Sequence, residues 1–181
     1  MNKITIIGTG YVGLVTGVGM AEFGNKVICS DIDKTKINSL NSGILPIYEL
    51  GLEEIIKRNI KDNRLSFSSN IKESILKSDV IVIAVGTPQG ENGQADMSFV
   101  YSVAEIISDN INDYKLVVTK STVPIGSGKR IIDLINDKVD NPKLFDYVSN
   151  PEFLREGSAL KDFLWPDRVI IGTDCEKAYE I

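Results

Sequence analysis

The sequence predicts an α/β fold with a mostly parallel sheet, doubly wound so that helices cover both of its faces. Short runs rich in Val and Ile alternate along the whole chain with stretches of helical periodicity. Residues 79–85 form an almost unbroken apolar run, as a central parallel strand buried on both faces requires. The first apolar run leads directly into a glycine-rich turn and then a helix, which is how such sheets often begin.

That first unit begins with a strand over residues 3–7 and continues as a helix over 12–23. Between them Gly8, Gly10 and Gly13 have the G-x-G-x-x-G spacing of a Rossmann-like dinucleotide site. Gly8 permits the tight turn, Gly10 lets the backbone approach a pyrophosphate, and Gly13 lets the helix pack closely. The free N–H groups and dipole of the helix then favour a bound phosphate.

A second strand over residues 26–31 ends in Asp31. This acid follows the glycines by about 20 residues, where dinucleotide-binding folds place the carboxylate that accepts from the adenosine ribose. A carboxylate there repels a 2′-phosphate, so NAD is expected rather than NADP. A single Asp at a strand end is common on any surface, but here strand, glycines, helix and acid occur in register.

The alternation continues to the end of the chain. We expect helices over 34–40, 52–60, 71–77, 96–107 with Asp96 as N-cap, and 129–135. We expect strands over 65–68, 79–85, 116–119, 147–148 and 169–171. An irregular connection over 46–51 and a polar loop over 89–95 complete the chain.

Polar or glycine-containing turns follow several of these strands. In a parallel sheet, ligands bind beyond the carboxyl ends of the strands. One crevice should therefore be lined by Gly10, Asp31, Thr87, Thr122 and Glu152. Taken one at a time, a Thr-Pro or Ser-Thr turn merely ends a strand about as often as it binds a ligand.

Composition narrows the function classes. With 181 residues and no Pro- or Ser-rich linker, the chain reads as a single domain. The net charge is −5 and basic residues are scattered, so we expect neither nucleic acid nor a membrane as partner. Glycines interrupt the apolar start, which argues against a signal peptide, and no run is long enough to span a bilayer.

The chain has two cysteines and no histidine. Two cysteines do not make a disulfide framework, and a reducing cytoplasm is expected. The absence of histidine removes Ser-His and Cys-His nucleophile pairs and His-based zinc sites, and we expect no metal. Acid–base chemistry must then use a carboxylate, Lys, Tyr or bound water.

Three blocks carry a resemblance to a known family. They are Val85-Gly86-Thr87-Pro88, Lys120-Ser121-Thr122-Val123-Pro124 and Asn150-Pro151-Glu152-Phe153-Leu154-Arg155-Glu156-Gly157. With them, and with the glycine turn and Pro166-Asp167-Arg168-Val169-Ile170-Ile171-Gly172, the whole chain resembles the nucleotide-sugar 6-dehydrogenases. The octapeptide is the most specific block, because generic Rossmann packing has no use for it.

Together, fingerprint and resemblance imply a set of cofactor contacts: Gly8, Gly10, Tyr11, Val12, Gly13, Asp31, Lys36, Thr87, Pro88, Ser121, Thr122 and Glu156. Ser121 would lie beside the nicotinamide, and Lys36, which alone reads as a solvated helix charge, near the adenosine. The implied sugar-site residues are Glu152, Phe153, Leu154, Arg155 and Glu156. Glu152 resembles the family's acid–base carboxylate, and Thr122 would help to position a water.

By the same resemblance, the reaction is a two-step oxidation of the sugar C6 alcohol to a carboxylate, with two NAD molecules and a cysteine-linked thioester. Neither Cys29 nor Cys175 matches that cysteine, since both adjoin or neighbour acidic residues. The chain therefore reads as an N-terminal NAD-binding domain over 1–181, without the central helix and the UDP-sugar-binding domain. The complete enzyme is expected to be a homodimer.

Several alternatives stay open. The tripeptide Pro166-Asp167-Arg168 favours UDP-glucose as the substrate, but relatives that act on GDP-mannose or UDP-N-acetyl-sugars share most of these blocks. Leu50 stands where the family usually has proline, which affects local loop stiffness. From other classes, a stand-alone NAD-sensing module would explain the glycines and Asp31 but not the octapeptide, and a purely structural domain would bind no cofactor.

Overall fold

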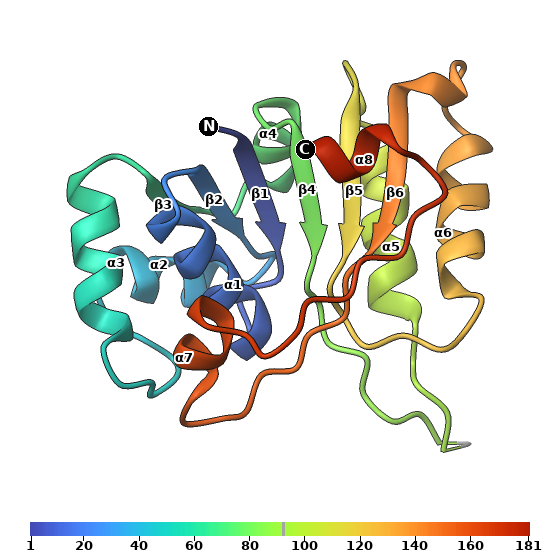
Figure 1. Ribbon diagram of the computed structural model, residues 1–181. Helices are drawn as coiled ribbons and strands as arrows, with labels where there is room; N and C mark the ends of the chain where they lie inside the picture. Colours follow the sequence, from blue (N-terminus) through green and yellow to red (C-terminus); the bar gives the residue numbers. More distant parts are fainter. Residues whose placement is uncertain (92) are drawn as a thin grey trace.

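The computed structural model describes residues 1–91 and 93–181 of the chain. The sheet has six parallel strands in the order β3-β2-β1-β4-β5-β6 (Figure 1). The strands β2 and β3 extend the sheet from β1 to one side, and β4, β5 and β6 extend it from β1 to the other. The strands are β1 Lys3–Ile7, β2 Lys26–Ser30, β3 Leu65–Ser68, β4 Val80–Ile83, β5 Lys115–Thr119 and β6 Phe145–Ser149. The predicted parallel, doubly wound α/β fold is confirmed.

Helices cover both faces of this sheet (Figure 1). On one face lie α1 Tyr11–Glu22, α2 Lys34–Asn41, α3 Leu52–Lys61, α7 Ala159–Leu164 and α8 Lys177–Glu180. On the other face lie α4 Ile71–Leu76, α5 Ser98–Ser108 and α6 Ser127–Asn136. A short 3₁₀ turn, η1 Pro142–Leu144, precedes β6. Of the described helices, none combines the length and the apolar character needed to cross a bilayer.

Side-chain alternation along the strands divides the core into two apolar clusters. In β4, Val80 and Val82 belong to the cluster under α1 and α3, whereas Ile81 and Ile83 belong to the cluster under α5 and α6. All four residues are buried, as the apolar run predicts. The strand is therefore packed on both sides.

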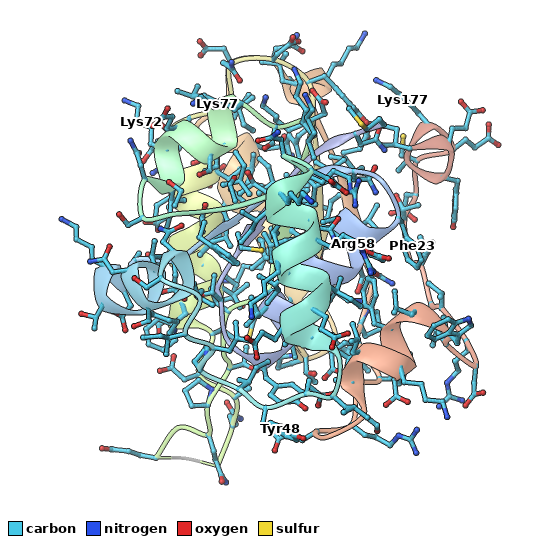
Figure 2. All side chains as sticks on the ribbon, turned by 90° about the vertical axis from the view of Figure 1, so that its left-hand side faces the viewer. Phe23, Tyr48, Arg58, Lys72, Lys77 and Lys177 are labelled. Atoms are coloured by element: carbon cyan, nitrogen blue, oxygen red, sulfur yellow. The ribbon has the colours of Figure 1, made fainter. Side chains whose placement is uncertain are left out.

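The surface carries its charges in small, separate groups. Figure 2 shows Lys72 and Lys77 extending outward at α4, and Lys177 on the other side of the view. Lys77 is paired with Glu73 at i,i+4, and Arg58 with Glu22 across α3 and α1. Exposed pairs of this kind contribute little to stability but keep charge dispersed.

One prediction about the end of the chain needs correction. Residues 169–171 do not form a strand: Val169, Ile170 and Ile171 are exposed and pair with no neighbouring strand. Only Gly172 makes an isolated antiparallel bridge, to Ser149 at the end of β6. Beyond that bridge, the described residues of this run form no ladder hydrogen bonds with β6, so no strand is defined there.

Other differences are small. The helix predicted from Asp96 begins at Ser98, with the Asp96 carboxylate accepting from the Ser98 N–H at 2.9 Å. Helices α7 and α8 were not predicted, because each spans six residues or fewer and shows little periodicity. The predicted loop over 89–95 includes Asn92, which lies outside the described residues.

Candidate functional site

The turns singled out in the sequence all lie at one edge of the sheet. Because every strand is parallel, the turns after β1, β2, β4, β5 and β6 follow the carboxyl ends of their strands. Gly10 and Asp31 follow β1 and β2, Thr87 and Thr122 follow β4 and β5, and Glu152 follows β6. The edge where doubly wound folds bind ligands is thus the edge that carries the polar turns.

Two of the three glycines are required by the chain itself. Gly8 has φ +103°, and a Cβ there would stand 2.6 Å from the Ala84 carbonyl oxygen. A Cβ at Gly13 would stand 1.9 Å from the Gly8 carbonyl oxygen. A larger residue at Gly8 would therefore meet the backbone after β4, and one at Gly13 would push the first helix away from the end of β1.

Gly10 differs from them. Its φ is −71°, which any residue adopts, and apart from its neighbours in the chain nothing lies within 4 Å of the place a Cβ would take. It is the N-cap of α1, whose first N–H groups have no partner within the helix. The fold therefore does not need glycine here, whereas a phosphate group approaching the helix N-terminus would.

A cavity of about 300 Å³ opens beside this turn. Gly10, Asp31 and Lys36 line its polar side. Its apolar wall comes from α4 and α5, with Ile71, Phe99, Val103 and Ile106. A slot with a helix N-terminus at one end, a carboxylate at the other and an apolar wall matches a dinucleotide's pyrophosphate, ribose and adenine in turn.

Asp31 is held by a dense set of hydrogen bonds. Its Oδ2 accepts from the Thr9 N–H and the Thr9 hydroxyl, both at 2.8 Å, and from Lys36 Nζ at 3.1 Å. Its Oδ1 accepts from the Asp33 N–H at 3.0 Å. Burial acts to raise the pKa of Asp31, but the hydrogen bonds from Asp33, Thr9 and Lys36 outweigh it, so the pKa lies below its ordinary value.

These contacts define what Asp31 offers a ligand. Oδ2 already accepts three hydrogen bonds, so Oδ1 is the oxygen with capacity left for a ribose hydroxyl. Lys36 uses one of its three N–H donors on Asp31, which leaves the ammonium able to bind an oxygen of the same sugar. The two residues present an acceptor and a donor side by side at the mouth of the cavity.

The turns after β4 and β5 touch each other. The Thr87 hydroxyl donates to the Thr122 carbonyl at 2.9 Å, and the Ser121 hydroxyl donates to the Val85 carbonyl at 2.7 Å. Ser121 is buried, whereas the side chain of Thr122 is exposed. The structure thus brings Thr87, Ser121 and Thr122 together, next to the glycine turn after β1.

The segment after β6 folds back on itself. The Glu152 carboxylate accepts from the Leu154 N–H, and Arg155 makes a two-pronged pair with Asp162, whose closer contact is 2.6 Å. The Arg155 pair lowers the pKa of Asp162 to about 2. Arg168 stacks over the Phe153 ring, 4.7 Å from its centre. Arg155 is therefore held within its own segment.

Glu152 lines a second cavity, of about 200 Å³, which also includes Met20 and Phe23 from the C-terminal end of α1. Lys120 and Asn150 share it, with Met20 and Phe163 among the apolar members. Lys120 is buried and donates to Asn150 Oδ1 at 3.1 Å. Burial lowers the pKa of Lys120, against the opposing charge of Glu152.

The expected single crevice is thus two neighbouring hollows at one edge. Gly10 and Asp31 line the first, Glu152 lines the second, and Thr87 and Thr122 line neither. A direct contact ties the two sides together, since the Gly157 N–H donates to the Tyr11 hydroxyl at 2.6 Å. Tyr11 is the first residue of α1, immediately after Gly10.

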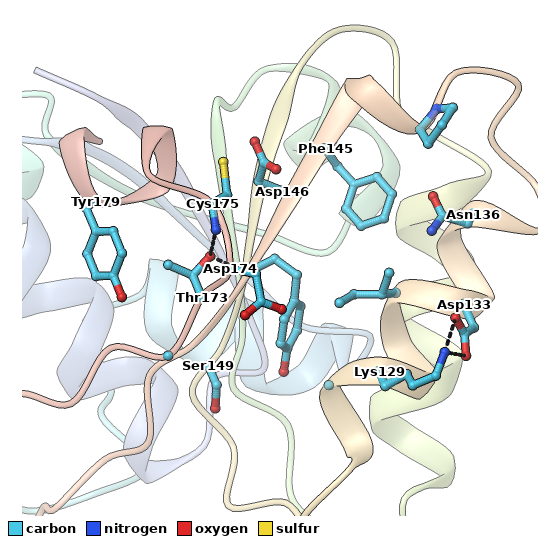
Figure 3. Close-up of a pocket in the computed structure, with 15 residues that line it drawn as sticks. Lys129, Asp133, Asn136, Phe145, Asp146, Ser149, Thr173, Asp174, Cys175 and Tyr179 are labelled. Atoms are coloured by element: carbon cyan, nitrogen blue, oxygen red, sulfur yellow. Dashed lines mark hydrogen bonds and ion pairs between the residues drawn. The ribbon is translucent and has the colours of Figure 1, made fainter.

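A larger hollow lies elsewhere. Residues of α6, β6 and the last segment of the chain line a cavity of about 900 Å³ (Figure 3). Its lining includes the Lys129–Asp133 pair of α6 and the Thr173 hydroxyl, which accepts from the Cys175 N–H. It contains no residue predicted for the site, and β6 lies far from the point between β1 and β4 where the strand order reverses.

Comparison with known proteins decides the family. The model of the "UDP-glucose/GDP-mannose dehydrogenase family, NAD binding domain" matches residues 2–181. The chain belongs to this family. As its NAD binding domain, the chain has NAD as its cofactor.

Relatives in the dehydrogenase family are similar over the whole chain. The UDP-glucose 6-dehydrogenase TuaD of Bacillus subtilis is 49% identical over 181 residues, which is 100% of this chain and 39% of the relative. A UDP-glucose 6-dehydrogenase of Rhizobium meliloti is 48% identical over 95% of this chain and 39% of its own length. The chain spans about two-fifths of the length of these relatives.

Solved structures of the dehydrogenase family have the same fold. A UDP-glucose dehydrogenase from Pyrobaculum islandicum superposes with a TM-score of 0.95 and 40% identity, covering 99% of this chain and 42% of that one. A GDP-mannose dehydrogenase from Pseudomonas aeruginosa gives 0.94 and 36%, covering 98% of this chain and 42% of that one.

Neither cysteine of this dehydrogenase domain is placed as a nucleophile for the cavities. Cys29 is buried in β2, and burial raises the pKa of its thiol to about 12. Cys175 is partly buried and lines the large cavity at β6, but neither of the hollows lined by Gly10, Asp31 and Glu152.

Four residues at this edge had no role assigned from the sequence of the dehydrogenase domain. Lys120 and Asn150 stand inside the quoted blocks, so the blocks themselves signalled them. Glu49 carried no pattern beyond an acid in an irregular connection, yet it is buried and contacts Gly157. Asp162, seven residues after Arg155, could not be paired with it without the fold.

Proposed function

We propose that the protein containing this chain is an NAD-dependent dehydrogenase that oxidises UDP-glucose to UDP-glucuronate, and that this chain is its N-terminal, NAD-binding part. The observation that carries the proposal is the hydrogen bond between Tyr11 and Gly157. It joins the glycine turn after β1 to residues 152–157, the segment that contains Glu152 and Glu156. The UDP-glucose 6-dehydrogenases that resemble the chain most among the relatives described above support the choice of sugar.

The cofactor residues divide by what they offer. The first N–H groups of α1, at Tyr11, Val12 and Gly13, hold the pyrophosphate over Gly10. Asp31 Oδ1 and Lys36 Nζ hold the adenosine ribose. Bound NAD supplies the acceptor for the two hydrides that the oxidation removes.

At the nicotinamide end we place the turns after β4 and β5. Thr87, Pro88, Ser121 and Thr122 form one side of the ring's site, since Thr87 and Thr122 are hydrogen-bonded to each other. Glu156 contributes from the segment after β6. Ser121 is itself held by the Val85 carbonyl, so its position is fixed before any ligand arrives.

On the sugar side, Glu152 is the acid–base residue, and residues 152–156 line the site. The Glu152 carboxylate accepts from the Leu154 N–H, which orients it, and Lys120 lines the same cavity. A carboxylate can take a proton from water during hydrolysis of a thioester, with Thr122 positioning that water. The thiolate for the thioester comes from another part of the protein, because Cys29 and Cys175 are not available.

A related sugar is the second candidate. Solved structures of a GDP-mannose dehydrogenase and of a UDP-N-acetyl-mannosamine dehydrogenase share this fold, with TM-scores of 0.94 and 0.83. We further propose that the complete enzyme is a homodimer acting in the cytoplasm on a UDP-sugar, with neither nucleic acid nor membrane as partner. An NAD-sensing module without chemistry would leave the 152–157 segment unexplained.

Two measurements test the proposal. The complete protein is supplied with NAD and, in turn, UDP-glucose, GDP-mannose and a UDP-N-acetyl-hexosamine, and NADH is followed by absorbance. UDP-glucose should give the highest kcat/KM, and no turnover with any of them would support the sensing module instead. In parallel, calorimetric titration of this chain should show tighter binding of NAD than of NADP, and no steady NADH production with UDP-glucose.

A further inference from the structure

Glu49 occupies an unusual place for a carboxylate. It lies in the irregular connection before α3, and only 6% of its surface is exposed. Its Oε1 accepts from the Gly157 N–H at 2.5 Å, and its Oε2 lies 3.5 Å from the Leu160 N–H. Glu49, which lies between β2 and β3 in the chain, is thus hydrogen-bonded to the segment that follows β6.

The same Gly157 N–H has a second acceptor, the hydroxyl of Tyr11 at 2.6 Å. Tyr11 begins α1, and the backbone turn before it is the proposed pyrophosphate site. One amide therefore lies between the helix that holds the cofactor and the connection that carries Glu49. The segment 152–157 is fixed at its far end by these two oxygens.

Backbone geometry at Gly157 directs the amide toward them. Gly157 has φ +86°, in the left-handed region that favours glycine, and Gly51 near Glu49 has φ +82°. A Cβ at Gly51 would lie 3.8 Å from Leu160 Cδ2, so the connection packs close to the start of α7. The contact is built from special backbone positions on both sides.

Stability alone does not account for a carboxylate here. Among the residues that the structure describes, Glu49 has no ion-pair partner, and its charge is met by backbone N–H groups. Burying a charge in this way is costly, and an apolar residue of similar size would usually serve packing as well or better. A charged acceptor does what an apolar residue cannot, which is to fix the direction of one N–H.

We infer that Glu49 is a positioning residue which, with the Tyr11 hydroxyl, holds the 152–157 segment in register with the cofactor turn. Glu49 lines neither the cavity beside the glycine turn nor the cavity that contains Glu152. It acts through its hydrogen bond to Gly157. Binding of a dinucleotide next to Tyr11 then changes the environment of the Gly157 amide, so the glycine turn and the 152–157 segment are coupled. The importance of that register for catalysis rests on the proposed function, since that proposal places the acid–base and sugar residues in this segment.

The test uses the ¹⁵N-labelled chain and follows the Gly157 amide by NMR. In Glu49→Leu, which removes both acceptor oxygens, hydrogen exchange at Gly157 should be about tenfold faster or more. In Glu49→Gln, which keeps one carbonyl oxygen of the same size, exchange should return most of the way to the wild-type rate. Glu54→Gln, an exposed acid in the first turn of α3, is the matched control and should leave Gly157 unchanged.

Titration with NAD gives a second measurement, the shift of the Gly157 resonance, which would not depend on Tyr11 if Tyr11 were merely structural. NAD should shift the Gly157 resonance in the wild-type chain, and Tyr11→Phe should reduce that shift by more than half. Tyr48→Phe, at a side chain that is 83% exposed, is the control for this change. The amides of β4 should exchange at unchanged rates in every variant, which separates local release from global loosening.

Two results would overturn the inference. One is a Gly157 exchange rate in Glu49→Leu within about twofold of wild type; the other is an NAD-induced shift that survives Tyr11→Phe in full. If Glu49→Leu does not fold, Glu49→Asp, whose shorter side chain withdraws the oxygens, replaces it with the same expectation. Failure of NAD to shift any resonance of the wild-type chain would instead reject the proposed function, while the exchange rates still decide the role of Glu49.

Discussion

Lys36 Nζ lies 3.1 Å from Asp31 Oδ2, so the carboxylate at the end of β2 is partly neutralised by a helix residue five positions later. The pair is only partly exposed, with 32% of the Lys36 side chain and 11% of the Asp31 side chain accessible. Discrimination against a 2′-phosphate therefore depends on both charges. A phosphate arriving here meets a cation as well as an anion.

From this pair we expect Lys36→Met to increase the preference for NAD over NADP by about tenfold, a change of about 1.4 kcal/mol in relative binding free energy. Removal of the ammonium leaves Asp31 uncompensated, and the added phosphate loses its cation. Calorimetric titration with both cofactors measures the ratio. Lys34→Met, at an exposed position of the same helix, is the control, and an unchanged ratio in Lys36→Met would contradict the assignment of the ribose site.

The glycines of the turn should separate into two kinds of variant. Gly13→Ala forces a methyl group against the Gly8 carbonyl and should destabilise the fold by about 1–3 kcal/mol. Gly10→Ala meets nothing in the chain and should change stability by less than about 1 kcal/mol, while weakening NAD by about tenfold or more. Urea denaturation and NAD titration of both variants measure the difference. Equal loss of stability in the two would remove the ligand as the reason for Gly10.

Asp31 should give the fold a specific acid sensitivity. Because its pKa in the folded chain is below the ordinary 3.8, its contribution to stability is complete above that value and is lost as the pH falls through the lowered pKa. The gap in Tm between wild type and Asp31→Asn should be constant from about pH 5 to pH 7 and should narrow below about pH 4. Thermal unfolding across this range measures it. A gap that widens in acid would mean that the pKa is raised.

In the complete enzyme, Glu152→Gln should slow hydrolysis of the thioester by about 100-fold or more, since general-base catalysis contributes factors of that size. Binding of NAD should be unchanged, because Glu152 lines a different cavity from Gly10, Asp31 and Lys36. Single-turnover kinetics with UDP-glucose separates hydrolysis from the oxidative steps. Glu105→Gln, on the exposed side of α5, is the matched control; a normal hydrolysis rate in Glu152→Gln would take the residue out of this role.

Strand and helix positions could be read from the sequence because local patterns determine them. The apolar run at β4, the glycine turn and the Leu65–Ser68 strand all appear where the pattern places them. Residues 169–171 show the limit of such patterns, because an apolar run becomes a strand only when a neighbour supplies ladder hydrogen bonds. The end of β6 does so for Gly172 alone.

The sequence by itself determined that Asp31 and the glycine turn lie at one edge of the sheet, since parallel strands bring their carboxyl ends to the same edge whatever else the chain does. Only the tertiary structure decided that Gly10 and Glu152 line separate hollows and that Glu49 and Tyr11 share the Gly157 amide. Those contacts join residues more than a hundred positions apart. Their geometry depends on how α1, the connection before α3 and the segment after β6 pack together, which no local spacing in the sequence encodes.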